Sequence, residues 1–417
     1  MGQYIIQGGR RLTGSVRVQG AKNSALPILA ATVAVGRPCV IYNCPDLSDI
    51  DSTIRILRAL GCEVHRSAGT VSVDSSRLSS VCIDDSLMSE LRSSIIFLGA
   101  LISATGEAVM TAPGGCNIGL RPIDLHLKSI EKLGVTVTEE YGQIKCTCKR
   151  ARGNKITLSF PSVGATENII LAAVKASGVT TIINAAREPE IVDLAMFLNS
   201  CGARISGAGD STIIIEGVER LHSVQYAIMP DRIVASTYMA AAAVTGSSLI
   251  IDEVIPSHLT PVVSCFEQTG CRIDVSGNKM RISAPDRLKA PEKIRTMPYP
   301  GFPTDCQAIM TSVACIADGI TIIHENIFEN RFKHVYELNR MGADISVEGK
   351  VAVINGVRQL QGAYVYATDL RAGAALVVAG LCADGITTVN SIKYIDRGYD
   401  SLEKNLTMLG ADIRRKE

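Results

Sequence analysis

The hydrophobic pattern of the chain repeats. Helical runs rich in Ala, Val and Ile each end at a glycine and lead into a β-branched, strand-like segment. These glycines are Gly36, Gly106, Gly178, Gly246, Gly319 and Gly385. A second marker, a glycine between a helical pattern and a short strand pattern, runs in phase with the first. It comprises Gly61, Gly134, Gly202, Gly270, Gly342 and Gly410, separated by 73, 68, 68, 72 and 68 residues. Since glycine commonly follows a helix end, each unit reads helix, Gly, strand, helix, Gly, strand, turn, strand.

Six units of this length predict an α/β protein. They are longer than usual solenoid repeats and suit compact α/β domains better. The simplest grouping is three units per domain, with a boundary near residues 225–231. Two strand-like segments, Tyr4–Gln7 and Arg17–Gln19, precede the first unit. The pattern alone allows them to pair with either half.

The composition of the chain limits the classes of function that the protein can have. A chain of 417 residues with 47% hydrophobic residues is long enough for two to three domains with substantial cores. It carries 42 basic and 41 acidic residues, a net charge of +1. This balance argues against a nucleic-acid-binding protein with a broad basic face. An anionic ligand would instead be bound by a local cluster of cations.

The sequence predicts a cytoplasmic protein without a membrane segment, metal or cofactor. The N-terminus has no basic segment followed by an apolar run, and the apolar stretch Ala25–Val35 is too short to cross a bilayer. The 13 cysteines are scattered without CxxC pairs, as expected of reduced thiols. The six histidines are dispersed, so their spacing suggests no metal site.

One position of the repeat is nearly always charged. Fourteen residues before each glycine of the first marker stand Lys22, Arg92, Gly164, Arg232, Asp305 and Arg371. The position is near a predicted helix start, where the helix dipole disfavours cations. An anionic ligand held by helix N-termini and basic side chains would explain the four cations. The alternative is a set of solvated residues with local acidic partners, such as Asp231 beside Arg232. Recurrence across the repeats favours a ligand.

A glycine-rich loop carries a cysteine. Pro113-Gly114-Gly115 precedes Cys116, and Arg121 follows five residues later, in front of Pro122. A permanent cation near an exposed thiol lowers its pKa. The alternative is a glycine-rich turn with an unreactive cysteine. After Pro122 the pattern becomes helical, and we expect His126 to be a helix residue rather than an acid or base.

Seven motifs together resemble one family of enzymes. They are Gly20–Ser24, Pro113–Cys116 with Gly119–Pro122, Ala185–Glu190, Phe302–Asp305, Glu329–Phe332, Ala367–Ala372 and Asp396–Tyr399. In order and spacing they are similar to those of the UDP-N-acetylglucosamine enolpyruvyl transferases (MurA) of the EPSP synthase/MurA family, over nearly the whole chain. The resemblance implies two inside-out α/β barrels of three repeats each. It also implies that the chain crosses between domains twice, giving residues 20–229 one domain and residues 1–19 with 230–417 the other, with the active site between them.

The resemblance also implies a reaction. Family members move the enolpyruvyl group of phosphoenolpyruvate to the 3′-hydroxyl of UDP-N-acetylglucosamine and release phosphate, the first committed step of peptidoglycan precursor synthesis. The nearest alternative is the enolpyruvyl transferase that acts on shikimate 3-phosphate, whose family lacks the Gly-Gly-Cys loop. A second alternative is a non-catalytic nucleotide-sugar sensor, although a sensor has no need for the thiol. The oligomeric state stays open.

Site residues follow from the matching motif positions. Phosphoenolpyruvate would be held by Lys22, Arg121 and Arg397. Other contacts to the two substrates would come from Asn23, Arg92, Arg121, Pro122, Ile123, Asp124, Leu125, Ser162, Val163, Gly164, Asp305, Ile327, Arg331 and Arg371. Cys116 would add to phosphoenolpyruvate and protonate its methylene carbon, and Asp305 would be the general base. Asp369 is a second candidate for proton transfer. Arg331, Arg371 and Arg397 would stabilise charge on the phosphate.

The chain departs from the family pattern near Ser162. Phe160 and Pro161 stand where some members have lysine and valine, so a lysine contact to the nucleotide is missing. Cysteine is retained at position 116, where some members carry aspartate. The retained thiol predicts sensitivity to fosfomycin, an epoxide that alkylates it.

Overall fold

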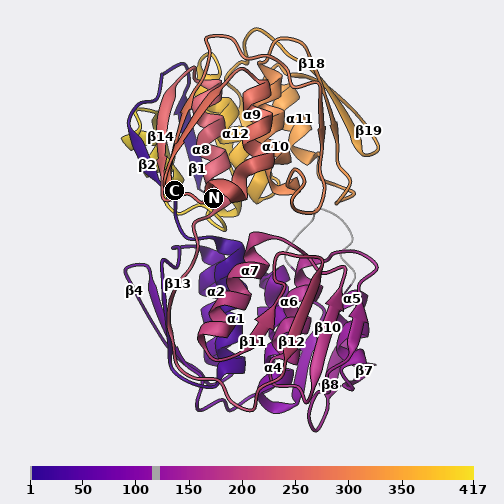
Figure 1. Ribbon diagram of the computed structural model, residues 1–417. Helices are drawn as coiled ribbons and strands as arrows, with labels where there is room; N and C mark the ends of the chain where they lie inside the picture. Colours follow the sequence, from indigo (N-terminus) through magenta and orange to yellow (C-terminus); the bar gives the residue numbers. More distant parts are fainter. Residues whose placement is uncertain (1, 115–122) are drawn as a thin grey trace. The chain divides into compact units, whose positions relative to one another are not determined.

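The computed structural model describes residues 2–114 and 123–417 (Figure 1). The described residues form two compact units. The N-terminal unit comprises residues 20–114 and 123–229, and the C-terminal unit comprises residues 2–19 and 230–417. Three residues of the expected site, Cys116, Arg121 and Pro122, lie outside the described residues.

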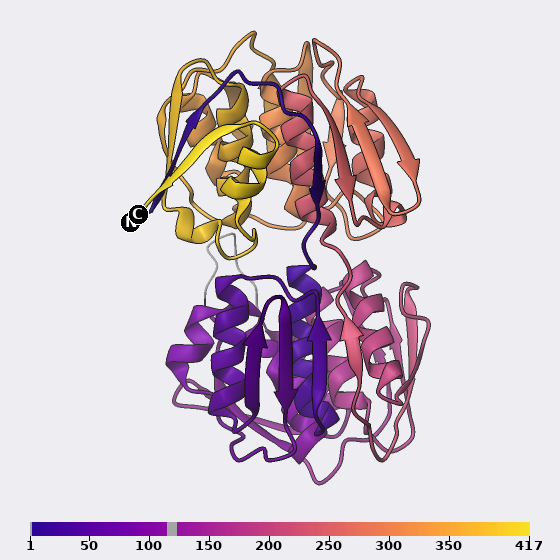
Figure 2. The same ribbon diagram turned by 90° about the vertical axis from the view of Figure 1, so that its left-hand side faces the viewer.

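The described part of the N-terminal unit contains three sheets. The first has the strand order β13 (Gln225–Ala227), β3 (Cys39–Tyr42), β5 (Thr70–Asp74), β4 (Glu63–Ser67). The second has the order β6 (Glu107–Thr111), β8 (Gln143–Thr147), β7 (Thr136–Glu140). The third has the order β11 (Arg204–Ser206), β12 (Thr212–Glu216), β10 (Val179–Ile183), β9 (Lys155–Thr157). In Figure 2 the indigo strands of the first sheet lie side by side, with the pink β13 next to them.

The described part of the C-terminal unit contains three more sheets. Their orders are β15 (Arg272–Ser276), β16 (Lys279–Ser283), β14 (Ser248–Asp252), β2 (Ser15–Arg17); then β17 (Lys293–Arg295), β18 (Ile320–His324), β20 (Val351–Asn355), β19 (Asp344–Glu348); and β21 (Tyr364–Tyr366), β22 (Ile386–Asn390), β1 (Gln3–Gln7), β23 (Asp412–Lys416). Both N-terminal strands therefore pair within the C-terminal unit. The second of them begins at Ser15, two residues before the predicted start.

Five of the sheets share one topology. In each of them a three-residue edge strand runs parallel to its neighbour, and the other two pairings are antiparallel. In the third sheet, for example, β9 runs parallel to β10, whereas β10 and β11 both pair antiparallel with β12. The β6 sheet has only an isolated parallel bridge at this place, between Cys82 and Val109. In the N-terminal unit β13, the last strand, pairs in parallel with β3, the first. This pairing places the last strand of the unit at the edge of the sheet that contains its first strand.

Helices of two kinds pack with these sheets. Six are buried almost all round, as expected of helices that are apolar on every face: α1 (Lys22–Val35), α4 (Phe97–Thr105), α6 (Val163–Ala173), α8 (Arg232–Val244), α10 (Gln307–Cys315) and α12 (Leu370–Cys382). Within each unit the three buried helices contact one another and form its core. The others are α2 (Ser48–Ala59), α3 (Asp85–Glu90), α5 (Asp124–Lys132), α7 (Pro189–Ser200), α9 (Thr260–Gln268), α11 (Lys333–Arg340) and α13 (Leu402–Met408).

The glycine markers have a backbone cause. All twelve marker glycines adopt a positive φ, from +60° at Gly246 to +116° at Gly319. Residues with a Cβ rarely adopt this conformation, which lets the chain reverse at a helix end. The repeat in the sequence is thus a repeat of helix terminations. Among the described residues, none of the helices has the length and apolar character needed to cross a membrane.

Candidate active site

The first helix of the N-terminal unit begins with an ion pair. Nζ of Lys22, at the start of α1, lies 2.5 Å from a carboxylate oxygen of Asp49, in the first turn of α2. Both side chains are nearly buried, at 11% and 5% exposed. Asn23 follows on α1 and is half-buried.

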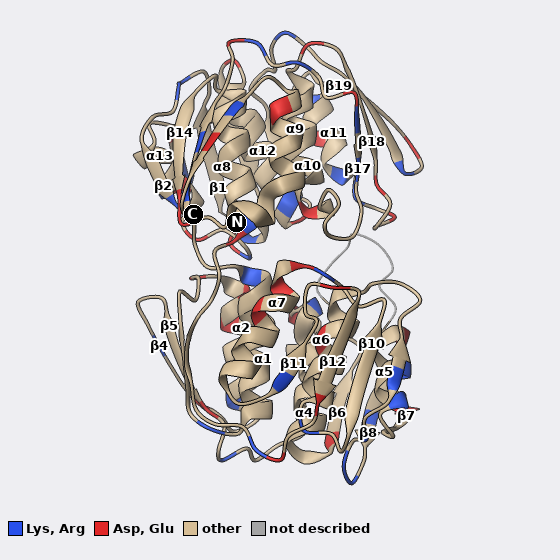
Figure 3. Ribbon diagram, viewed as in Figure 1, with Lys and Arg blue, Asp and Glu red and all other residues tan. Residues whose placement is uncertain are grey.

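The buried helices are almost wholly tan in Figure 3, and charged segments gather toward the helix ends.

Arg92 is fixed beside the glycine-rich loop. It begins the short 3₁₀ helix η1 (Arg92–Ile96), and its Nη1 donates to the carbonyl of Pro113 at 3.0 Å. The backbone N–H of Gly114 donates to the carbonyl of Met88 at 3.1 Å. Pro113 and Gly114, the last described residues before position 115, are therefore each held by a hydrogen bond.

A buried histidine links α5 and α6. His126 is 8% exposed, and its Nδ1 lies 2.7 Å from Nδ2 of Asn168. The amide of Asn168 is oriented by two further bonds: Nδ2 donates to Ile95 O, and Oδ1 accepts from the N–H of Gly99. Since Nδ2 can only donate, Nδ1 of His126 must accept, and the ring proton resides on Nε2. Burial, reinforced by the charge of Arg92, lowers the pKa of His126 to about 4.

The residues around His126 are those expected to contact the nucleotide sugar. A Cβ on Gly164 would lie 2.9 Å from Cε1 of His126, so the ring packs directly on that glycine. Ser162 caps α6 by accepting from the N–H of Ala165 at 3.3 Å. Beside this segment Phe160 is 43% exposed. The remaining expected residues, Val163, Ile123, Asp124 and Leu125, lie on or next to the first turns of α6 and α5.

In the C-terminal unit, Asp305 lies between two arginines. It belongs to the 3₁₀ turn η3 (Thr304–Cys306); Oδ1 accepts from Arg331 at 2.6 Å and Oδ2 from Arg371 at 2.9 Å. The arginine side chains are only 4% and 5% exposed, whereas Asp305 is 26% exposed. Burial alone would lower the pKa of Arg371, but the charges of Asp305, Tyr399 and Asp231 and the hydrogen bond to Asp305 together outweigh burial and raise it.

Aspartates cap two of the helices that carry a cation in the first turn. Oδ1 of Asp369 accepts from the N–H groups of Arg371 and Ala372, at 2.9 and 3.1 Å. In the same way Asp231 caps α8, which begins with Arg232. The local acidic partners considered as an alternative are therefore present, as N-caps. Their negative charge offsets the unfavourable effect of a cation at the same helix end.

Arg397 and Ile327 complete the expected set. Arg397 follows the 3₁₀ turn η4 (Ile392–Tyr394), and the residue before it, Asp396, accepts a bidentate pair of bonds from Arg415 at 2.8 and 2.9 Å. Ile327 lies in the loop after β18 and is half-buried. No group of side chains in residues 2–114 and 123–417 is arranged to hold a metal ion.

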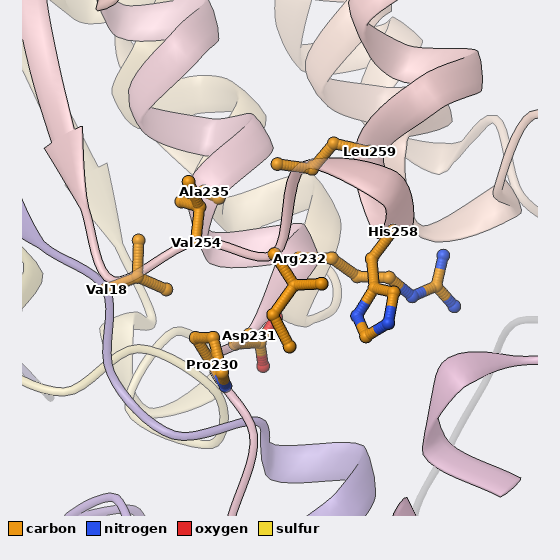
Figure 4. Close-up of a pocket in the computed structure, with 9 residues that line it drawn as sticks. Val18, Pro230, Asp231, Arg232, Ala235, Val254, His258 and Leu259 are labelled. Atoms are coloured by element: carbon orange, nitrogen blue, oxygen red, sulfur yellow. The ribbon is translucent and has the colours of Figure 1, made fainter. Parts of the chain in front are cut away.

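A small pocket lies beside the start of α8 (Figure 4). It has an empty volume of about 170 Å³ and is lined by residues that include Val18, Asp231, Arg232 and His258. Arg232 also lies over the ring of Tyr299, 5.6 Å from its centroid. This volume includes space open to solvent, and the enclosed part is too small for a water molecule, so this pocket alone does not hold a nucleotide sugar.

A model of one protein family spans nearly the whole chain. The family described as EPSP synthase (3-phosphoshikimate 1-carboxyvinyltransferase) matches residues 6–406. The chain belongs to this family. The membership confirms the EPSP synthase/MurA family predicted from the motifs.

Relatives within the EPSP synthase family are similar over their full length. A protein of Caldanaerobacter subterraneus subsp. tengcongensis named UDP-N-acetylglucosamine 1-carboxyvinyltransferase 2 is 54% identical, with 100% of both chains covered. A protein of Geobacter metallireducens named UDP-N-acetylglucosamine 1-carboxyvinyltransferase is 46% identical, covering 100% of this chain and 99% of the relative.

Solved structures of the family share the fold. The enolpyruvyl transferase NikO from Streptomyces tendae superposes with a TM-score of 0.89 at 29% identity, covering 100% of this chain and 99% of that one. An EPSP synthase from Acinetobacter baumannii has a TM-score of 0.75 at 18% identity, with both chains fully covered. The predicted α/β class is thereby confirmed as a mixed α/β fold of the family.

Within each unit the structure brings expected residues together. In the N-terminal unit, η1 contacts both α1 and α6, and Arg92 and Gly164 both lie by His126. In the C-terminal unit Asp305, Arg331 and Arg371 form one ion-paired group. Sequence reasoning missed Asp49, the partner of Lys22. Its position in the first turn of a predicted helix was the only signal, and that position is ordinary for an acidic residue.

Proposed function

We propose that the protein transfers the enolpyruvyl group of phosphoenolpyruvate to the 3′-hydroxyl of UDP-N-acetylglucosamine and releases phosphate. The product is the first committed precursor of peptidoglycan, and the protein acts in the cytoplasm. The observation that carries the proposal is the 54% identity, over the whole of both chains, to a relative named for this reaction. The retained thiol at Cys116 supports this substrate over shikimate 3-phosphate.

The proposed architecture follows from the family. Residues 20–229 form one domain and residues 1–19 with 230–417 the other, and each is an inside-out α/β barrel of three repeats. Six sheets of closely similar topology in the described residues support the count of repeats. Each domain contributes one set of charged side chains to the binding of phosphoenolpyruvate and the nucleotide sugar.

The N-terminal domain holds the nucleotide sugar and part of phosphoenolpyruvate. Lys22 and Arg121 bind the phosphate and carboxylate of phosphoenolpyruvate, which require convergent cations. Arg92 and the starts of α5 and α6 bind the nucleotide sugar. The side chain of Phe160 is exposed and apolar, so the diphosphate must rely on backbone N–H groups at the start of α6. Anion binding at a helix N-terminus needs no lysine.

The geometry of Asp305 shapes its role as the base. Both carboxylate oxygens already accept a charge-assisted hydrogen bond from an arginine. Each oxygen has a second lone pair that can accept from the sugar hydroxyl, but the two arginines stabilise the negative charge and make Asp305 a weaker proton acceptor until one of them moves to another anion. The phosphate of phosphoenolpyruvate supplies that anion, so Arg371 changes partner as the substrates bind. Asp305 is thus a stronger proton acceptor in the complete complex than in the free protein.

The chemistry is addition followed by elimination. The 3′-hydroxyl attacks C2 of phosphoenolpyruvate while C3 is protonated, giving a tetrahedral phospho-ketal. Loss of phosphate and of a C3 proton then restores the double bond. Cys116 delivers the C3 proton, Asp305 accepts the hydroxyl proton, and Arg331, Arg371 and Arg397 stabilise the charge on the phosphate. Asp369, whose Oδ1 is engaged as an N-cap, is the less favoured acceptor.

The test is phosphate release from phosphoenolpyruvate with and without UDP-N-acetylglucosamine, for the wild type and for Cys116→Ala. Release that needs both substrates and collapses in the variant supports the reaction and the role of Cys116. Release that survives in the variant moves proton transfer to another group. Turnover of shikimate 3-phosphate would overturn the choice of substrate. Tight ligand binding without turnover would support a sensor instead.

A further inference from the structure

A buried carboxylate connects three segments of the C-terminal unit. Glu325 follows β18 and is 1% exposed. Its Oε1 accepts from Thr296 Oγ1 at 2.9 Å and from the backbone N–H groups of Ile327 and Phe328 at 2.9 and 3.1 Å. Its Oε2 accepts from Thr304 Oγ1 at 2.9 Å. Acidic residues are rarely buried without such partners, and here four donors satisfy the carboxylate.

The donors belong to the segments that carry the expected base and a sugar contact. Thr304 immediately precedes Asp305. Ile327 is itself an expected substrate contact, and Phe328 leads to Arg331, whose guanidinium lies 5.5 Å from the centroid of the Phe328 ring. One carboxylate therefore ties the backbone beside Asp305 to the loop that ends in Arg331.

We infer that Glu325 is a positioning residue for the sugar acceptor, and this inference rests on the proposed function. Its Oε2 fixes the turn that carries Asp305, and its Oε1 fixes the loop that presents Ile327. The 2.6 Å ion pair between Asp305 and Arg331 is a second connection between this turn and this loop. The general base and the sugar contact are thus held in one rigid frame, as accurate proton transfer requires.

The length of the side chain matters to this frame. Oε1 meets two successive backbone N–H groups of the loop while Oε2 reaches the other segment. An aspartate is one methylene shorter, so it can satisfy the loop or Thr304 but not both. A glutamine keeps the reach, because its amide oxygen can accept from the loop and its amide nitrogen can donate to a hydroxyl that has turned round. The order of activity expected is therefore Glu, then Gln, then Asp.

Thr304→Val tests the connection to Asp305 with little change of shape. It removes one charge-assisted hydrogen bond, for which roughly a tenfold loss of kcat is expected if the bond is used to place the base. KM for phosphoenolpyruvate should change less than kcat, because the hydroxyl of Thr304 is bonded to Glu325 and not to the arginines expected to bind that substrate. Glu325→Asp should lower kcat further and raise KM for UDP-N-acetylglucosamine, and Glu325→Gln should restore most of both.

The matched control is Thr321→Val. Thr321 lies on β18, the strand that leads to Glu325, and is fully buried, and its hydroxyl has no hydrogen-bond partner among the described residues. The control makes the same atom replacement without cutting the frame, so kcat should equal that of the wild type. Rates are compared per folded molecule, with folding measured by circular dichroism.

The outcomes separate the inference from the function it rests on. A wild type without turnover would overturn both together. A wild type that turns over, with Thr304→Val and Glu325→Asp at wild-type kcat and KM, would overturn the positioning role alone. Equal losses in Thr304→Val and Thr321→Val would also overturn it, because they would reflect general weakening of the unit. If Glu325→Asp fails to fold, Thr304→Val and Glu325→Gln still decide the matter.

Discussion

Asp305→Asn tests how strongly the C-terminal unit depends on its paired arginines. The change keeps the shape of the side chain but removes the charge that neutralises Arg331 and Arg371, both at most 5% exposed. Breaking a fully buried pair costs about 3–5 kcal/mol. Because Asp305 itself is 26% exposed, solvent screens part of this, and a loss of about 2–4 kcal/mol in the free energy of unfolding is expected.

The assay is thermal unfolding followed by circular dichroism. For a unit of this size, each kcal/mol shifts Tm by roughly 2–4 °C, so Asp305→Asn should unfold roughly 5–15 °C earlier than the wild type. The control is Asp274→Asn, whose ion pair with Arg272 has side chains 51% and 79% exposed and should contribute little. Equal Tm values for the two variants would refute the argument. So would an Asp305→Asn protein as stable as the wild type.

Three further predictions concern the N-terminal unit and the loop. Fosfomycin should abolish activity, and Cys116→Ala should block the labelling of the thiol, whereas Cys82→Ala, which removes an exposed thiol, should not; full activity after long exposure to excess drug would contradict this. Because the pKa of His126 is about 4 when folded and 6.5 when unfolded, the unfolded chain binds the extra proton between these values. The free energy of unfolding should therefore fall by roughly 3 kcal/mol as pH drops from 6.5 to 4, and His126→Gln should remove that slope. Gly164→Ala places a Cβ 2.9 Å from Cε1 of His126 and should raise KM for UDP-N-acetylglucosamine more than KM for phosphoenolpyruvate; equal changes in both would count against a local effect.

The repeats could be predicted because their cause is local. The steric requirements of a few neighbouring residues favour a glycine with positive φ after a helix, so the helix ends are visible in the sequence as glycines. The placement of β1 could not be predicted in the same way. Its partners are β22 and β23, so that Gln3 faces Asn390 and Lys416. A short strand pattern carries no information on a partner almost four hundred residues away.

Part of the site could also be predicted, because some of its residues stand at a fixed position of the repeat. Asp305 and Arg371 stand at one position of the repeat, so spacing alone singled them out. Arg331 lies outside that position and was recognised only through the family resemblance. Glu325 was missed altogether, because an acidic residue just after a strand usually marks a solvated turn. Only the packing of three segments around it makes it a buried acceptor.

The two explanations of the helix-start cations are compatible. In the described residues Lys22 has Asp49, Arg371 has Asp305 and a capping Asp369, and Arg232 follows its capping Asp231. Local acids therefore make these cations tolerable while no ligand is bound. An anionic substrate can compete for the same guanidinium and ammonium groups, because exchanging one carboxylate for a phosphate keeps the number of charge-assisted bonds nearly constant. Such an exchange also frees a carboxylate at the moment the substrate arrives. For Asp305 that is when a proton acceptor is needed, so pairing in the free protein and catalysis in the complex can use the same three side chains.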